Sequence, residues 1–206
     1  NSASVGARPA IGVFVSPHGF GHASRTHAIL ERMLEIEPIL QIELFTRIPK
    51  WFFSSLSDNI DFHELDCDLG LVQSDALRVN YDATLADLSD RLPFDPTEIR
   101  RLGQQLRRLD CQSVLCDIAP LGLVAARAAQ LPSVLVENFT WDWIYEGLAL
   151  PDQVNRTVVE EFEIVARKVE MLPPVAPQPL DIFLDAVDIL LLFLGRVGVI
   201  KTQVKL

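Results

Sequence analysis

Basic residues and cysteines are both scarce in this sequence, and each shortage narrows the possible functions. The chain has 18 lysines and arginines against 28 aspartates and glutamates, so its formal net charge is −10. An acidic chain of this kind is not expected to bind nucleic acid, because phosphate groups bind to basic surfaces. The three cysteines, Cys67, Cys111 and Cys116, match no common zinc-site spacing. We therefore expect no metal site, an inert buried thiol at Cys116, which lies in an apolar run, and a reduced, cytoplasmic setting.

Long hydrophobic runs are absent as well. The densest run, Val187–Gly195, is far too short to span a bilayer, so a buried strand or a returning helix is the preferred interpretation. Residues 1–10 lack the apolar core of a signal peptide and are interpreted as a flexible leader. We thus expect no transmembrane segment. A chain of 206 residues with 49% hydrophobic and 22% charged residues has the composition of a globular protein.

Short apolar runs alternate with amphipathic ones over residues 11–150. The polar loop at residues 66–80 is long enough to suggest a function. Strands are expected at residues 11–16, 41–46, 60–65, 113–118 and 133–138, and helices at residues 22–36, 83–91, 96–109 and 122–130, with a short helix after Pro49. This order predicts an α/β fold with a doubly wound, mostly parallel, Rossmann-like sheet.

Ligands of such sheets bind beyond the carboxyl ends of the strands, and three segments of this chain fall there. In the first, VFVSPHGFGHASR, Gly19 and Gly21 permit a sharp turn into a helix that begins near His22. The start of a helix suits phosphate or a sugar hydroxyl, because its N–H groups are unpaired. A plain strand-to-helix turn explains the glycines equally well.

A histidine at this edge can remove a proton from a hydroxyl group, provided that a carboxylate fixes its tautomer. Asp117 is the natural partner for His22, since it follows the apolar run VLC at the end of another strand. Capping of the helix at Pro120 is the alternative interpretation of Asp117. His27 is expected to be structural or solvated, and His63 has no obvious partner.

The third segment, ENFTWDWIY, brings two tryptophans and a tyrosine around Asp142. Aromatic faces beside a carboxylate commonly hold a sugar ring. The alternative is that Trp141 and Trp143 pack the helix against the sheet. Because they are two residues apart, a helix places them on different sides, so we expect one in the core and one facing the cleft.

Four motifs in order, HGFGHASR, DCDLGLVQSDAL, VLCDIAP and ENFTWDWIYE, resemble a known family. They resemble the glycosyltransferase-like proteins typified by the amino-terminal half of plant L-arabinokinases and by their free-standing bacterial relatives. The resemblance implies the N-terminal half of a GT-B fold, in which two Rossmann-like domains face each other across a cleft. The acceptor binds to the first domain, and the nucleotide-sugar binds mainly to the second.

The resemblance also implies a function. Residues 11–150 would form the acceptor-binding domain of a metal-independent glycosyltransferase that uses a nucleotide-sugar as co-substrate and no other cofactor. His22 would be the catalytic base for a hydroxyl acceptor, and Asp117 would orient it. Family motifs suggest further sugar or phosphate contacts at His18, Arg25, Gln73, Asp75, Asn138 and Trp141. Gly19 and Gly21 are expected to join them, because residues without a Cβ let the backbone approach a ligand closely.

A second domain of comparable size is not recognisable in the sequence. Residues 151–206 are interpreted as a helix, a proline-rich linker and the remnant or start of that domain. We therefore expect no turnover of a nucleotide-sugar by this chain alone. The alternative function is a non-catalytic sugar-binding or regulatory module on the same fold, and a domain that binds some other small anion is a third possibility.

Overall fold

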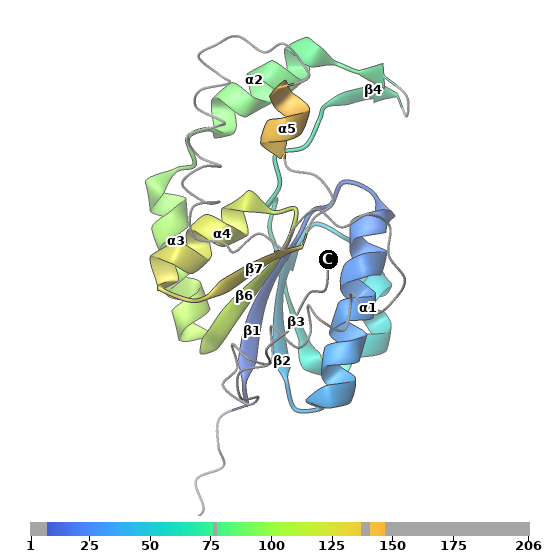
Figure 1. Ribbon diagram of the computed structural model, residues 1–206, viewed down its shortest axis with the longest axis vertical. Helices are drawn as coiled ribbons and strands as arrows, with labels where there is room; N and C mark the ends of the chain where they lie inside the picture. Colours follow the sequence, from blue (N-terminus) through green and yellow to red (C-terminus); the bar gives the residue numbers. More distant parts are fainter. Residues whose placement is uncertain (1–7, 76–77, 137–140, 147–206) are drawn as a thin grey trace, which may run out of the picture.

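The computed structural model describes residues 8–75, 78–136 and 141–146 (Figure 1). In this part of the chain the elements are, in order, β1 (Ala10–Val15), α1 (Phe20–Ile36), β2 (Gln41–Thr46), the 3₁₀ helix η1 (Lys50–Asn59), β3 (Ile60–Glu64), β4 (Gln73–Asp75), β5 (Arg78–Val79), α2 (Tyr81–Arg91), α3 (Pro96–Arg108), β6 (Cys111–Asp117), α4 (Pro120–Ala129), β7 (Ser133–Val136) and α5 (Trp141–Glu146). The predictions for Asn138 and for residues 151–206 lie outside the described residues.

The centre of the fold is a five-stranded parallel sheet with the order β3-β2-β1-β6-β7. β1 lies in the middle because AIGVFV is a continuous apolar run, which suits a strand covered on both faces, and all of its residues are buried. The chain adds strands outward from β1 on one side and outward from β6 on the other. The predicted doubly wound, Rossmann-like α/β fold is therefore confirmed.

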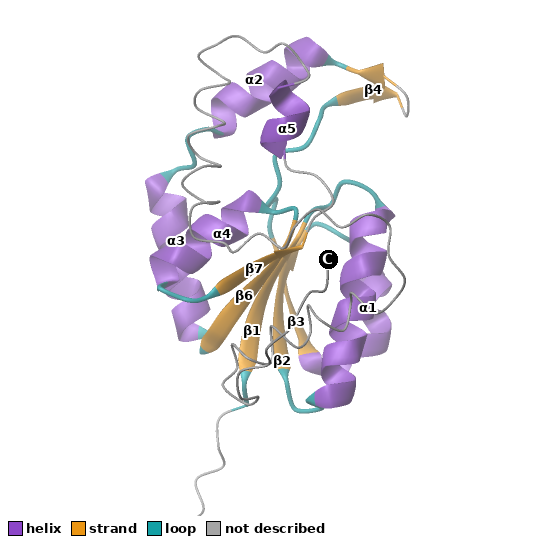
Figure 2. Ribbon diagram, viewed as in Figure 1, coloured by secondary structure: helices purple, strands orange, loops and turns teal. Residues whose placement is uncertain are grey.

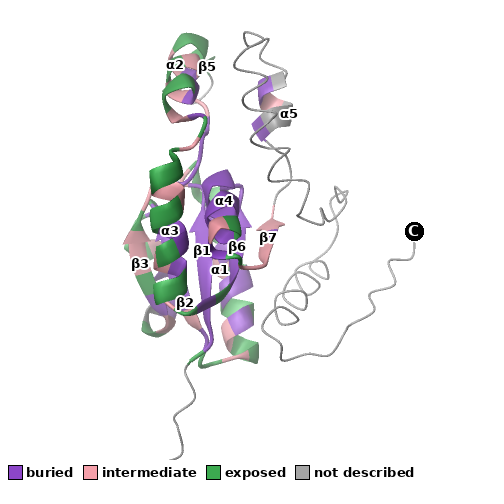
Figure 3. Cartoon of the chain, turned by 90° about the vertical axis from the view of Figure 1, so that its left-hand side faces the viewer, coloured by how far each residue is buried: buried purple, intermediate pink, exposed green. Residues whose placement is uncertain are grey.

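Helices cover both faces of the sheet (Figure 2). α1 and η1 pack on one face, where Leu30 and Phe53 are buried. α3 and α4 pack on the other face, where Leu106 and Ala125 are buried. α4 is buried along most of its length, whereas α3 is largely exposed on its outer side (Figure 3). The two faces arise because right-handed crossovers lead away from the centre of the sheet in opposite directions.

A small layer, consisting of β4, β5, α2 and α5, lies beyond the carboxyl ends of the parallel strands (Figure 1). Its apolar cluster is formed by Leu69, Leu88, Leu92, Ile118, Trp141 and Tyr145. β4 and β5 pair antiparallel inside the segment that was expected to be a loop, residues 66–80. That prediction was incomplete because strands of two or three residues are too short to show a hydrophobic period.

Several element boundaries differ from the sequence prediction by one or two residues, and two of them lie near the end of the chain or the candidate site. β1 begins at Ala10, inside the expected leader, and Gln41 N–H donates to the carbonyl of Pro9 just before it. α1 begins at Phe20 rather than near His22, because Gly19 has a φ of 81° and completes the turn one residue before the helix.

Within the described residues, no helix has the length and apolar character needed to cross a membrane.

Candidate functional site

The candidate site lies where the direction of winding reverses, between the carboxyl ends of β1 and β6. β1 leads through a short turn into α1, and three residues on the first turns of α1 approach the end of β6. His22, Arg25 and Thr26 are spaced i, i+3 and i+4, so they share one face of the helix. That face is directed at Asp117, the last residue of β6.

Asp117 accepts hydrogen bonds on both carboxylate oxygens although its side chain is only 1% exposed. Arg25 donates from Nε to Oδ2 at 2.9 Å and from Nη2 to Oδ1 at 2.5 Å, which is a bidentate contact. Thr26 Oγ1 donates to Oδ2 at 2.9 Å, and His22 Nδ1 lies 3.0 Å from Oδ1. Burial acts to raise the pKa of Asp117, but the hydrogen bonds from these residues and the charge of Arg25 lower it overall. The carboxylate is therefore ionised at neutral pH.

The lowered pKa of Asp117 predicts a loss of stability in acid. Its value in the folded chain lies below the ordinary value of 3.8, so the unfolded chain binds the proton more tightly. The stabilisation from ionised Asp117 is thus complete above the ordinary pKa and is lost as the pH falls through the folded pKa. We expect Asp117→Asn to show a smaller acid-induced drop in the free energy of unfolding, measured by urea unfolding at a series of pH values. An unchanged pH dependence would contradict the assignment.

The contact with Asp117 sets the tautomer of His22. An ionised carboxylate can only accept, so Nδ1 of the neutral ring donates to it and Nε2 carries the lone pair. The His22 side chain is 14% exposed. The alternative role of Asp117 as a helix cap is wrong, because α4 has Ala119 at its N-cap and no side-chain capping bond.

Sequence reasoning missed a second buried carboxylate, Asp68, in the segment that follows β3. Ser16 Oγ donates to Oδ2, Trp141 Nε1 donates to Oδ1 at 2.5 Å, and Leu69 N–H donates to Oδ1 at 2.8 Å. Burial raises the pKa of Asp68, and the hydrogen bonds offset this only in part. Arg91 Nη1 also donates to the Asp68 carbonyl at 2.6 Å. Asp68 therefore joins the end of β1 to α2 and α5 of the small layer.

His18, which was expected to contact substrate, contacts this same segment in the structure. Its Nε2 lies 3.2 Å from both the N–H and the carbonyl oxygen of Leu71, and its Nδ1 lies 3.7 Å from Asp68 Oδ2. Its ring also meets the edge of Trp141 at a centroid distance of 5.8 Å. The two histidines of HGFGH thus differ in role: His18 holds residues 68–71 in place, and His22 pairs with Asp117.

Replacing Gly70 with alanine is expected to lower the free energy of unfolding by about 1–3 kcal/mol. Gly70 has a φ of 64°, and a Cβ there would stand 1.8 Å from Cε1 of His18. Urea unfolding measures the change. The matched control is Gly21→Ala on α1, where no atom lies within 4 Å of the added methyl group, so its stability should stay equal or rise slightly. Equal losses in the two variants would contradict the prediction.

The other predicted contact residues are spread over three places. Gly19 is the N-cap residue of α1, and Gly21 lies in its first turn. Trp141 is 4% exposed and packs in the core of the small layer, stacked on Tyr145. Gln73 and Asp75 lie on the exposed strand β4. Asn138 and the side chain of Trp143 lie outside the described residues.

The remaining histidines have structural partners. His27 Nε2 lies 2.8 Å from Ser55 Oγ of η1, as expected for a structural residue. His63, for which the sequence offers no obvious partner, has one in the structure: its Nε2 lies 2.6 Å from Glu43 Oε2, and its ring stacks on Phe45. The β2–β3 register brings these side chains together on one face, which a single sequence does not show.

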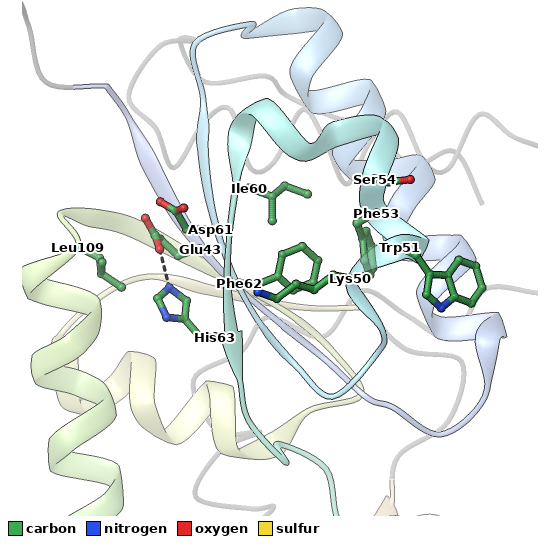
Figure 4. Close-up of a pocket in the computed structure, with 10 residues that line it drawn as sticks. All are labelled: Glu43, Lys50, Trp51, Phe53, Ser54, Ile60, Asp61, Phe62, His63 and Leu109. Carbon is green, nitrogen blue, oxygen red and sulfur yellow. Dashed lines mark hydrogen bonds and ion pairs between the residues drawn. The ribbon is translucent and has the colours of Figure 1, made fainter.

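A cavity of about 640 Å³ lies along the edge strand β3, away from the candidate site (Figure 4). Glu43, Asp61 and His63 line it from one side of β3, and Lys50, Phe53 and Phe62 line it from the other. It follows the edge of the sheet and does not open at the carboxyl ends of β1 and β6. Hence it contributes nothing to the chemistry of His22.

The cysteines are chemically inert in this fold. Cys67, Cys111 and Cys116 are free and buried. Burial raises the pKa of each thiol, to about 12 for Cys111, so none is a thiolate at neutral pH. In residues 8–75, 78–136 and 141–146, no group of histidine, cysteine and acidic side chains is arranged to hold a metal ion.

Comparison with known proteins gives one distant similarity in sequence. No family model matches the chain. The L-arabinokinase of Arabidopsis thaliana is 28% identical over 183 residues, which cover 85% of this chain and 17% of that protein. The similarity is to the N-terminal region of L-arabinokinase, so the predicted resemblance is confirmed. This chain spans less than a fifth of the length of that relative.

Solved structures show a likeness in fold at lower identity. MurG of Acinetobacter baumannii is 14% identical, with a TM-score of 0.43, over 83% of this chain and 44% of its own. A UGT transferase from Siraitia grosvenorii, solved in complex with UDP, is 15% identical, with a TM-score of 0.38, over 61% of this chain and 27% of its own. The chain is thus similar in sequence to the N-terminal region of L-arabinokinase.

Proposed function

We propose that this chain is the acceptor-binding domain of a glycosyltransferase that uses a nucleotide-sugar and needs no metal ion, with His22 as catalytic base and Asp117 as the residue that orients it. The observation that carries the proposal is the 3.0 Å contact between His22 Nδ1 and Asp117 Oδ1. It occurs at the point in a doubly wound sheet where ligands bind.

The proposed reaction uses the free tautomeric position of the ring. Nε2 of His22 takes the proton of the acceptor hydroxyl, and the acceptor oxygen attacks the anomeric carbon of the donor sugar. A new carbon–oxygen bond forms while the bond between that carbon and the diphosphate breaks, and the nucleotide diphosphate leaves with the electron pair. Asp117 orients the ring, and it keeps the hydrogen bond from Nδ1 after Nε2 has taken up the proton. In this proposal the donor binds to a second domain.

A sugar-binding module without transfer activity is the second candidate. The observation in its favour is the name of the similar protein, L-arabinokinase, which denotes phosphorylation of a sugar and not sugar transfer. In that case the same edge of the sheet would bind a free sugar, and the His22–Asp117 pair would hydrogen-bond to its hydroxyl groups.

Two measurements on the complete protein separate the candidates. Labelled UDP-glucose, UDP-galactose and UDP-arabinose are offered together with hydroxyl acceptors, and transfer of label is followed. Calorimetry then tests L-arabinose and galactose without any nucleotide. Transfer supports the glycosyltransferase, and sugar binding without transfer supports the module. If the protein shows no transfer of label and no binding of sugar, both candidates are overturned.

A further inference from the structure

Arg25 occupies an unusual place between the two members of the proposed dyad. Its guanidinium contacts both oxygens of Asp117, through Nε at 2.9 Å and Nη2 at 2.5 Å. The same Nη2 lies 3.4 Å from His22 Nδ1. The charged groups in contact with the His22 ring thus include Asp117 of β6 and Arg25 of its own helix. One is an anion and the other a cation, at comparable distances.

A buried carboxylate beside a histidine creates a problem for a base. An opposite charge at hydrogen-bond distance favours the protonated ring, and low exposure strengthens this effect. A ring held as imidazolium at neutral pH has no lone pair to accept a proton. Asp117 alone, at 1% exposure, would act on His22 in this direction. A useful base needs its hydrogen bond to the carboxylate without the full effect of the carboxylate charge.

We infer that Arg25 is a positioning residue that neutralises Asp117 and so keeps His22 in the neutral form that accepts a proton. The bidentate contact leaves the carboxylate able to accept from His22 Nδ1, which preserves the tautomer. The guanidinium charge near Nδ1 opposes protonation of the ring. Asp117 can therefore orient His22 while the guanidinium of Arg25 offsets the effect of the carboxylate charge on the ring. The inference rests on the proposed function, because it assigns Arg25 a part in that same reaction.

The direct test is the protonation of His22 in the full chain, followed by NMR of the ring protons. The chain has four histidines, so substituting each in turn assigns the signals. In Arg25→Met the pH of half-protonation of His22 is expected to rise by about one unit or more, because the carboxylate charge is no longer offset. Arg25→Lys keeps the charge without the bidentate contact, and its rise should be smaller. The control Arg32→Met, on the same helix and paired with exposed Glu35, should cause no change.

A purely structural role of Arg25 predicts the opposite result. If Arg25 only held Asp117 in position, Arg25→Met would loosen the contact with His22, and the pH of half-protonation would fall or stay constant. Either outcome overturns the inference. The double variant Arg25→Met with Asp117→Asn removes both charges, so half-protonation should return toward the parent value. If Arg25→Met does not fold, Arg25→Lys is compared with the parent chain instead. A rise in the pH of half-protonation of His22 then supports the inference, and a fall or no change overturns it.

The NMR result is independent of any transferase activity, so the inference and the proposed function can fail separately. Where transfer is observed, Arg25→Met should lose rate at neutral pH and regain it at alkaline pH, as the ring loses its proton. Variants of His22 should not regain rate at any pH. Transfer that is unaffected by His22 substitution would overturn the proposed base while leaving the charge measurement intact.

Discussion

Replacing Asp117 with alanine is expected to lower the free energy of unfolding by about 3 kcal/mol, the lower end of the range for breaking a buried ion pair. The substitution leaves the Arg25 guanidinium and the Thr26 hydroxyl without the acceptor that both use. The Arg25 side chain is 20% exposed, so water partly compensates, and this places the expected loss at the lower end. Urea unfolding at neutral pH, followed by circular dichroism, measures the difference.

The matched control for Asp117→Ala is Glu35→Ala. Glu35 also pairs with an arginine of α1, Arg32, at 2.6 Å, but both side chains are about half exposed. An exposed pair contributes less than about 1 kcal/mol, so the control should stay close to the parent chain. If the two variants lose the same stability, Asp117 is not the centre of a buried network. The loss of stability in Asp117→Asn should lie between those of the two alanine variants, since the amide oxygen of asparagine still accepts hydrogen bonds.

Replacing His22 with glutamine is expected to lower the rate of sugar transfer by the complete protein about 10²–10⁴-fold, the usual contribution of a general base. Glutamine is polar and of similar size, and it can still donate to Asp117, but it cannot take up the proton of the acceptor. The fold should survive, because Asp117 keeps its bonds from Arg25 and Thr26. The rate is measured under saturating donor, so that the loss is seen in kcat.

The control for this variant lies on the same helix. His27 contacts Ser55 of η1 at 2.8 Å, so His27→Gln changes a histidine of α1 that faces away from Asp117. Transfer by His27→Gln should remain within a few-fold of the parent. A similar rate for both variants would show that His22 is not the base, even if the domain does belong to a transferase.

The arrangement of His22 and Asp117 could be predicted from the sequence because it follows from a general property of parallel sheets. Strand ends meet at one edge, so polar residues that follow two apolar runs are brought together there. The contribution of Arg25 to the same carboxylate follows from its helical spacing with His22, once the start of the helix is known. Apolar runs placed the strand that precedes α1 and the strand that ends at Asp117, and the α/β class follows from the alternation of strands with helices.

Asp68 and the Glu43–His63 pair could not be predicted in this way. The partners of Asp68 come from β1 and α5, and their meeting depends on how the segment after β3 folds back, which no local period encodes. The contact of Glu43 with His63 depends on the register between β2 and β3. A shift of one residue would place the two side chains on opposite faces of the sheet. The contact between His18 and Leu71 could not be predicted for a related reason, since Leu71 lies 53 residues away in sequence.

The separation in sequence between α1 and β6 has a consequence for the order of assembly. Every bond that Asp117 receives from α1 spans between 91 and 95 residues. β1, α1, β2 and β3 can associate early through contacts between neighbours in sequence, but the pairing of β1 with β6 must wait for the long crossover through α2 and α3. During synthesis on the ribosome, β1, α1, β2 and β3 are made before Asp117, so the bonds of Arg25 and Thr26 to Asp117 form only after β6 has been synthesised. The arrival of β6 therefore supplies both the central strand pairing and the carboxylate that these side chains bind.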